Sequence, residues 1–369
     1  LGKCVHGKRS GFTVFELLVA TAITAVMAGL LIGITSGVMS VWNRSRGSLT
    51  TTNQVILALD QLASDLEGAI LRHDGNVWLA ATVLETNNPA ESESDSELVM
   101  TRQWSALTGA GSLIVKPRSQ DAGSDPAGFV LNAHSIDECR FGRAGVWLRF
   151  FSTKPDENSQ ISNLSAPAAV SYQLRRRRVT SNSSEILYML YRSVVRPTTT
   201  GGSGVQSAGT FQVGFDLVSS TYNSANAQND GNPGNVLRPH IGQVLANNVI
   251  DFGVRLYVRE KDTLRLIFPA KPAGLGIEPE VGESSDSSET VPAAELSHLA
   301  RYVPFVDPND AYRNRMPDVV EVMLRVLTDE GAQMIQALEA GRSSGDWWAI
   351  AEAHSRVYTR RIEIVGKPL

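Results

Sequence analysis

The chain has 369 residues, of which 42% are hydrophobic and 20% charged, a composition typical of a globular protein with room for a substantial core. Its formal net charge of −4 argues against a general nucleic-acid binder, because such proteins carry a marked positive excess. Nucleic acid is therefore not an expected partner.

The first predicted element is a long apolar segment from Phe12 to Val41, whose single charge is Glu16. A membrane-spanning helix needs about 20 apolar residues, and this run exceeds that length. Lys3, Lys8 and Arg9 precede it, which favours a cytoplasmic N-terminus. We therefore predict a single-pass membrane protein whose C-terminal part lies across the membrane.

Three interpretations of this segment compete. A secretory signal peptide also has a basic start and an apolar stretch, but that stretch runs about 7–15 residues and this one is longer. A plain membrane anchor fits the length but gives Glu16 no role, and a carboxylate in an apolar span costs about 2.5–3.5 kcal/mol at the bilayer centre. In the third interpretation the helix is cleaved and then assembled with other subunits, which gives the carboxylate a partner.

The residues from Lys8 to Ala20, KRSGFTVFELLVA, resemble the leader and cleavage site of type IV prepilins and pseudopilins. In that family a membrane peptidase cuts after the glycine and methylates the new N-terminus. The resemblance implies cleavage between Gly11 and Phe12, N-methylation of Phe12, and an assembly role for Glu16. The implied partners are the prepilin peptidase, other pilin or pseudopilin subunits, an inner-membrane assembly platform and the lipid bilayer. The implied location is the bacterial inner membrane, with the head outside the cytoplasm.

A newly cut amino terminus suits the assembly role of Glu16. An α-amine has a pKa of about 7.7–8.0 and is cationic at neutral pH. In the apolar interior of a filament, Glu16 of one subunit can pair with this amine on a neighbour, which relieves the cost of an unpaired buried charge. We expect this pair to set the axial register of the subunits.

The helical pattern continues beyond the apolar segment. Asp60 and Asp65 lie off the apolar face, and we predict a single helix from Phe12 to about Leu71. Glycines weaken this helix locally and permit close helix contact in a membrane, at Gly29, Gly33, Gly37 and Gly47. The apolar face has spacings of three and four, at Val55, Leu59, Leu62, Leu66 and Ile70.

After Gly75 the chain changes to runs typical of strands, separated by long polar loops. One run, from Asp318 to Leu327, alternates apolar and polar residues as a half-buried strand does. Short helices are predicted over Asp329–Ala340 and from about Trp347 onward. The strands are predicted at Glu97–Trp104, Ser112–Lys116, Gly145–Ser152, Ala168–Thr180, Glu185–Arg196, Val249–Arg259, Thr263–Phe268, Asp318–Leu327 and Val357–Val365.

These elements predict an α+β fold of pilin-like type, in which a long N-terminal transmembrane and amphipathic helix packs on an antiparallel β-sheet globular head. The predicted division is a leader peptide over residues 1–11, a pilin helix over 12–72 and a β-rich head over 73–369. Residues 12–41 form the transmembrane and assembly part of the helix.

The head resembles the general secretion pathway J-type minor pseudopilins in two places. The segment Val249–Tyr257, followed after a long loop by Met316–Leu324, is similar to the last strands of that family. Ala169–Leu174 and Leu187–Arg192 are similar to its middle hairpin. The prepilin-like proteins of the Verru_Chthon cassette are another group that the chain resembles.

Four consecutive arginines, Arg175, Arg176, Arg177 and Arg178, occur within one predicted strand. Alternation places two on each face, so we predict an exposed edge strand or a protruding hairpin. Such charges often guard an edge strand against unwanted pairing. The alternative is a patch that binds an anionic partner, such as an acidic protein, lipid headgroups or DNA.

Each of the other candidate sites has a purely structural interpretation as well as a functional one. Asp307, Asn309 and Asp310 are a candidate calcium site, but they also suit a polar turn and lack the full twelve-residue calcium-loop pattern. The pair Trp347-Trp348 suits core packing or a binding platform. Cys139 suits an inert small residue better than a reactive one.

The sequence therefore predicts a structural protein and not an enzyme, with no cofactor. No short catalytic motif such as H-E-x-x-H or G-x-S-x-G occurs. The predicted function is a minor pseudopilin or pilin-like subunit of a type II secretion or type IV pilus-related filament. The alternative is a membrane-tethered binding module that captures DNA, a surface or secreted cargo.

Overall fold

The structure is a computed structural model of the whole chain. It describes residues 13–84, 116, 135–142, 144–153, 167–178, 186–195, 214–217, 241–261, 263–269, 297–304, 312 and 314–364. The chain forms two compact units, Leu1–Thr50 and Thr51–Leu369.

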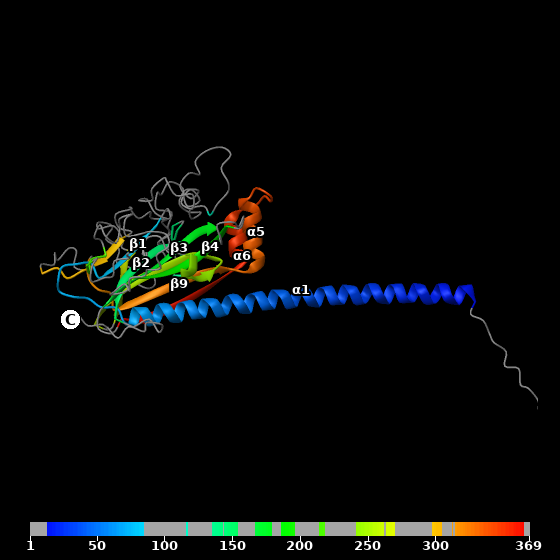
Figure 1. Ribbon diagram of the computed structural model, residues 1–369, viewed down its shortest axis with the longest axis horizontal. Coiled ribbons are helices and arrows are strands. Elements are labelled where there is room, and N and C mark those ends of the chain that lie inside the picture. Colours follow the sequence, from blue (N-terminus) through cyan, green and yellow to red (C-terminus); the bar gives the residue numbers. More distant parts are fainter. Residues whose placement is uncertain are drawn as a thin grey trace, which may run out of the picture. The chain divides into compact units, whose positions relative to one another are not determined.

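The first element is helix α1, Val14–Glu67, a continuous helix of 54 residues (Figure 1). Its first part, Val14–Met39, is apolar, and none of it is buried within the protein. From Thr51 onward the helix belongs to the second unit, where Val55, Leu62 and Leu66 are fully buried. The predicted helical face of the second part is therefore confirmed.

Helix α1 ends four residues earlier than predicted. After Glu67 the backbone turns to pair with a strand, because the Ile70 amide donates to the Phe151 carbonyl at 3.1 Å and Ala69 bridges to Ser152. Strand pairing therefore replaces the last predicted helical turn.

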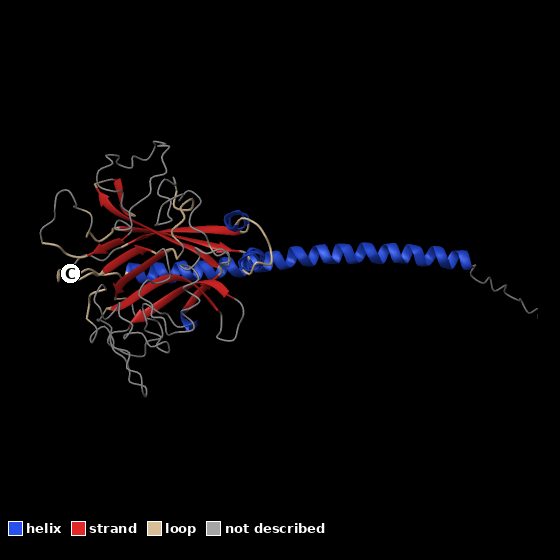
Figure 2. Ribbon diagram, turned by 90° about the horizontal axis from the view of Figure 1, so that it is seen from above, coloured by secondary structure: helices blue, strands red, loops and turns tan. Residues whose placement is uncertain are grey.

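The second unit contains a six-stranded antiparallel sheet with the order β5-β4-β3-β2-β1-β8. The strands of the protein are drawn in red in Figure 2. Strands β3 and β4 form a hairpin, whereas β8 pairs with β1, far from it in the sequence. The strands are β1 (Leu79–Val83), β2 (Val146–Ser152), β3 (Ala168–Arg178), β4 (Ile186–Val195), β5 (Val244–Asn247) and β8 (Ser297–Ala300).

A second antiparallel sheet has four strands in the order β10-β9-β6-β7. Its strand β6 faces β2, β3 and β4 of the larger sheet. The described residues thus form two β-sheets where one was predicted. The strands are β6 (Val249–Glu260), β7 (Thr263–Phe268), β9 (Val319–Leu327) and β10 (Ser355–Glu363).

Two short helices follow β9. Helix α5, Asp329–Glu339, begins where the Thr328 hydroxyl accepts the Gly331 amide at 3.2 Å. Helix α6, Trp347–Ala353, begins where the Asp346 carboxylate accepts the Ala349 amide at 2.7 Å. Both helices were predicted, and side-chain acceptors of this kind satisfy amides that have no partner within the helix.

The main core lies between the sheets and the second part of α1. The larger sheet is buried on both faces, as the side chains of β2 show. Leu148 and Phe150 belong to the main core, and Trp147 and Phe151 belong to a second, smaller core. The smaller core also contains Trp78, whose ring lies 4.9 Å from that of Phe151. A mixed α+β arrangement, as predicted, results.

Strand β9 is buried along its whole length, so the prediction of a half-buried strand is wrong. Its polar side chains are buried because they have partners. Glu321 accepts hydrogen bonds from Tyr257 at 2.8 Å and from Arg361 at 2.7 Å. Arg325 donates to the Asp137 carbonyl at 2.6 Å.

The other predicted strands from Gly145 onward are present, with ends that differ from the predictions by at most two residues. The predicted strand Glu97–Trp104 lies outside the described residues. Of the predicted strand Ser112–Lys116 only Lys116 is described, and it is not in a strand. Three observed strands, β1, β5 and β8, were not predicted. Each has only four or five residues, and each is placed by partners far away in the sequence.

Candidate functional site

The N-terminal part of α1 is the first candidate site. Val14–Met39 comprises 26 residues and is long and apolar enough to cross a membrane. At 1.5 Å per residue it measures about 39 Å, which exceeds the roughly 30 Å of a bilayer's hydrocarbon core. Large apolar side chains along it, such as Phe15 and Leu31, are exposed. Such a surface requires lipid or another apolar surface to cover it.

Polar side chains within this segment bond back to its own backbone. The Thr21 hydroxyl donates to the Leu18 carbonyl at 2.9 Å, and that of Thr35 donates to the Leu31 carbonyl at 2.7 Å. These hydroxyls therefore need no water, as a membrane environment demands.

Glu16 caps the first turn of the helix. Its Oε2 accepts hydrogen bonds from both the amide and the hydroxyl of Thr13, each at 3.0 Å. The Thr13 hydroxyl in turn accepts the Glu16 amide at 3.3 Å. This reciprocal arrangement is a capping box, and its local pattern, Thr13-x-x-Glu16, is visible in the sequence. Oε1 takes no part in these bonds. Gly11 and Phe12, the predicted cleavage site, lie outside the described residues.

Two of the four arginines of β3 are buried. The arginine stretch of β3 pairs with β4, whereas β2 pairs only with Ala168–Tyr172. The predicted exposure is therefore wrong for Arg175 and Arg176. Arg175 and Arg176 are each only 2% exposed. Arg175 donates to Gln173 at 3.1 Å. The side chains of Arg177 and Arg178 are outside the described part of the structure.

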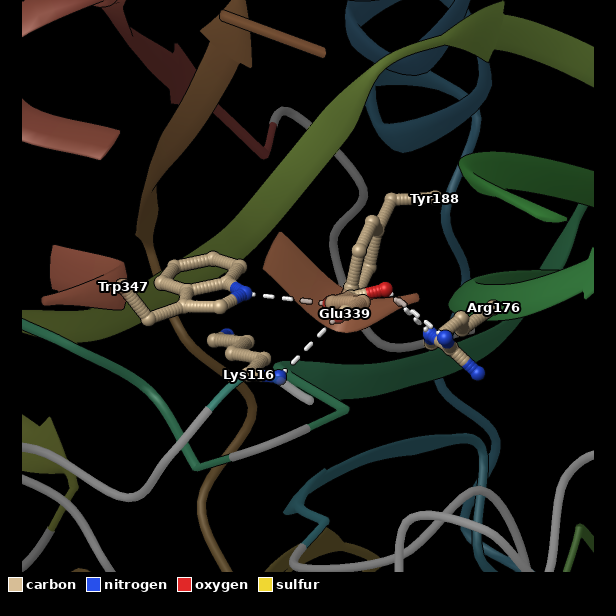
Figure 3. Close-up of polar contacts among 5 residues, drawn as sticks. All are labelled: Lys116, Arg176, Tyr188, Glu339 and Trp347. Atoms are coloured by element: carbon tan, nitrogen blue, oxygen red, sulfur yellow. Dashed lines mark hydrogen bonds and ion pairs between the residues drawn. The ribbon is translucent and has the colours of Figure 1, made fainter. Parts of the chain in front are cut away.

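Arg176 is buried because Glu339, at the end of α5, supplies its counter-charge (Figure 3). The Nε and Nη2 atoms of Arg176 donate to Glu339 Oε2 at 3.0 and 2.7 Å. The other oxygen, Oε1, accepts hydrogen bonds from Tyr188 and, at 3.0 Å, from Trp347. Burial, together with the charge of Glu339, raises the pKa of Tyr188 well above its ordinary value, so this phenol remains a proton donor. The arrangement fixes α5 and α6 to the larger sheet.

A second buried ion pair fixes α1 to the same sheet. Asp65 accepts hydrogen bonds from Arg192 Nε at 2.7 Å and Nη2 at 3.0 Å, and from the Tyr172 hydroxyl at 2.6 Å. Gln61, one turn earlier, donates to the same carboxylate at 3.0 Å. Sequence analysis placed Asp65 off the apolar face and so missed this contact.

The tryptophan pair and the cysteine singled out from the sequence are buried. Trp347 and Trp348 are buried in the main core, as one of their two interpretations predicted. Cys139 is a buried free thiol, and burial raises its pKa to about 11, so it stays protonated and unreactive at neutral pH.

The structure gives no metal site among the residues it describes, since no group of three or more His, Cys, Asp or Glu side chains converges there. The predicted calcium ligands Asp307, Asn309 and Asp310 lie outside those residues.

Comparison with family models, with curated proteins and with solved structures found no match to this chain.

Proposed function

We propose that this chain is a membrane-anchored, pilin-like filament subunit that is cut after Gly11 and assembled through α1. The observation that carries the proposal is the composition of this one helix. Val14–Met39 is apolar and exposed, and it carries one carboxylate, Glu16, five residues after Gly11. The part of α1 from Thr51 onward is instead buried in the core of the second unit.

A helix of this kind suits a subunit that moves from the membrane into a filament. In the membrane, lipid covers the apolar side chains of Val14–Met39. In a filament, the same side chains contact the helices of other subunits. The three glycines Gly29, Gly33 and Gly37 recur every four residues along one face, which allows the helices to approach closely.

The capping box supports the role of Glu16 in two ways. It supplies two donors to the carboxylate before assembly, which lowers the cost of holding a charge near the membrane. It also leaves Oε1 available to a further donor. We propose that the N-methylated amine of Phe12 on a neighbouring subunit is that donor.

Within this class, we propose a minor pseudopilin of a type II secretion or type IV pilus-related machine. The basis is the resemblance of the head to J-type minor pseudopilins and to Verru_Chthon prepilin-like proteins. The two segments that carry the J-type resemblance at the end of the chain lie in β6 and β9, which pair with each other. Those of the middle hairpin lie in β3 and β4, which also pair.

The alternative, a tethered binding module, has less support. Its clearest sequence feature was the run of arginines in β3, and Arg175 and Arg176 are buried, with Arg176 paired to Glu339. These two side chains offer no surface to an anionic partner.

Mass spectrometry of the N-terminus tests the proposal. When the chain is co-expressed with a prepilin peptidase, we expect the mature protein to begin with N-methylated Phe12. Gly11→Val should abolish the cut, whereas the control Gly7→Ala, in the same leader, should not. An intact leader in the presence of an active peptidase, or a new end beyond Met39, would refute the proposal.

A further inference from the structure

A buried lysine and a buried aspartate meet within the core of the second unit. Lys116 Nζ lies 3.7 Å from Asp251 Oδ1, and both side chains are fully shielded from solvent. Asp251 belongs to β6 of the four-stranded sheet. The backbone amide of Lys116 donates to the Tyr188 hydroxyl of β4, in the six-stranded sheet, at 3.2 Å (Figure 3). The pair therefore lies where the two sheets meet.

The surroundings of this pair exclude water and fix its geometry. The ring of Trp348 lies 5.6 Å from Lys116 Nζ. Phe141 packs so closely on β6 that a Cβ atom at Gly253 would come within 2.2 Å of its ring. The same Phe141 donates its backbone amide to Asp251 Oδ2 at 3.3 Å. One carboxylate oxygen thus faces a backbone donor, and the other faces the lysine.

The charges of this pair are costly in such an environment. Burial raises the pKa of Asp251 above its ordinary value, although the charges of Lys116 and Arg325 oppose the shift. Transfer of a proton from the ammonium to the carboxylate removes both buried charges. It also produces a neutral amine beside a carboxylic acid, which are the forms that condense to an amide.

We propose that Lys116 and Asp251 form an intramolecular isopeptide bond in the folded protein. The neutral Nζ attacks Cγ of Asp251, so that an N–C bond forms and the Cγ–Oδ1 bond breaks. Oδ1 leaves as water with the acid proton and one amine proton, and one hydrogen remains on the amide nitrogen. The reaction needs no oxidant, cofactor or other reactant.

The protein supplies the conditions for this condensation. Fixed proximity replaces a bimolecular encounter. The Phe141 amide stabilises the negative charge that develops on Oδ2. Exclusion of water opposes the reverse hydrolysis. After a cut at Gly11 the chain keeps one cysteine, Cys139, so no disulfide can form within it. The bond would join the segment at Lys116 covalently to β6. It does not depend on filament assembly.

The intact mass of the purified full-length chain, measured after denaturation, tests the proposal. We expect the wild-type mass to be lower than that of the sequence by one water molecule, once N-terminal processing is accounted for. Peptide mapping should yield a branched peptide that joins Lys116 to Asp251. Asp251→Asn should lose ammonia instead of water, because the carboxamide then supplies the leaving group.

Two variants serve as controls. Lys116→Arg should have the mass of its sequence, and Lys261→Arg, at an exposed lysine, should still lose one water. An unmodified wild-type mass would overturn the proposal. So would a loss of water that persists in Lys116→Arg, or one that hydroxylamine reverses, since both indicate a succinimide. The wild-type measurement reads the covalent state directly and does not require any variant to fold.

Discussion

Glu16 caps the first turn of α1, and we propose that it also pairs with the amine of a neighbouring subunit. Substitutions can separate these two roles. The Glu16 side chain accepts two hydrogen bonds from Thr13, so loss of the carboxylate removes the capping box and weakens the first turn. The helix is long enough to survive that loss. Cleavage depends on the segment around Gly11, so we expect Glu16→Ala to be cut normally but to enter filaments poorly.

The amount of processed subunit that cross-links to other pilin-like subunits measures this effect. Thr13→Val provides the matched control, because it removes the hydroxyl of the capping box and keeps the carboxylate. We expect the control to assemble nearly normally. Equal incorporation of Glu16→Ala and wild type would contradict the role assigned to the carboxylate.

His298 gives the head a predictable sensitivity to acid. Its ring lies in β8 and contacts the Arg315 carbonyl at 2.8 Å, and burial lowers its pKa from 6.5 to about 4. Between these values the unfolded chain binds a proton that the folded chain does not. Stability due to this group is therefore complete above pH 6.5 and falls as the pH falls toward 4, by as much as about 3 kcal/mol.

Urea unfolding of the detergent-solubilised chain at several pH values measures this effect. His298→Gln removes the titrating group while its amide can still donate to the Arg315 carbonyl. We expect the variant to lose less stability than the wild type between pH 6.5 and 4. If both lose the same amount, another group is responsible for the sensitivity.

At the scale of elements, α1 is attached to the head by ion pairs of very different burial. The Asp65–Arg192 pair has side chains that are 5% and 15% exposed, whereas those of Asp60–Arg360 are 56% and 39% exposed. Asp65→Asn leaves the Arg192 charge without its partner inside the protein, and we expect it to cost about 3–5 kcal/mol of unfolding free energy. Asp60→Asn should cost less than about 1 kcal/mol.

Chemical denaturation of the two variants under identical conditions compares these costs directly. Both substitutions remove one negative charge from the same helix, so general charge effects cancel between them. Similar losses in the two variants would show that Asp65 does not anchor the helix.

The elements also show which features the sequence could predict. Strands β4, β6 and β9 and helix α5 were predicted because their patterns are long and local. The ion pairs were not, because Glu339 lies 163 positions from Arg176, and Arg192 lies 127 positions from Asp65. The sequence alone predicts that an arginine-rich strand is exposed, because the counter-charge lies far away in the sequence. Short strands such as β1 and β8 were not predicted for a related reason. β1 is held by pairing with β2 and β8, and β8 by pairing with β1.

At the scale of the whole molecule, the apolar part of α1 and the basic residues before it predict which side of the membrane each part occupies. Lys3, Lys8 and Arg9 should hold the N-terminus in the cytoplasm, since positive residues beside a span favour that side. Everything after Met39, including both sheets, should then lie outside the cytoplasm.

Protease added to cells with a permeabilised outer membrane tests this orientation. We expect an epitope at the C-terminus to be digested and one at the N-terminus of a Gly11→Val variant, which keeps its leader, to be protected. Replacing the three basic residues with Gln should make the C-terminal epitope partly resistant, because the charge asymmetry that orients the helix is lost. Glu16→Ala should not, because a carboxylate contributes little to orientation. Protection of the C-terminal epitope in the wild-type chain would place the head in the cytoplasm, where a filament subunit of the proposed kind could not assemble.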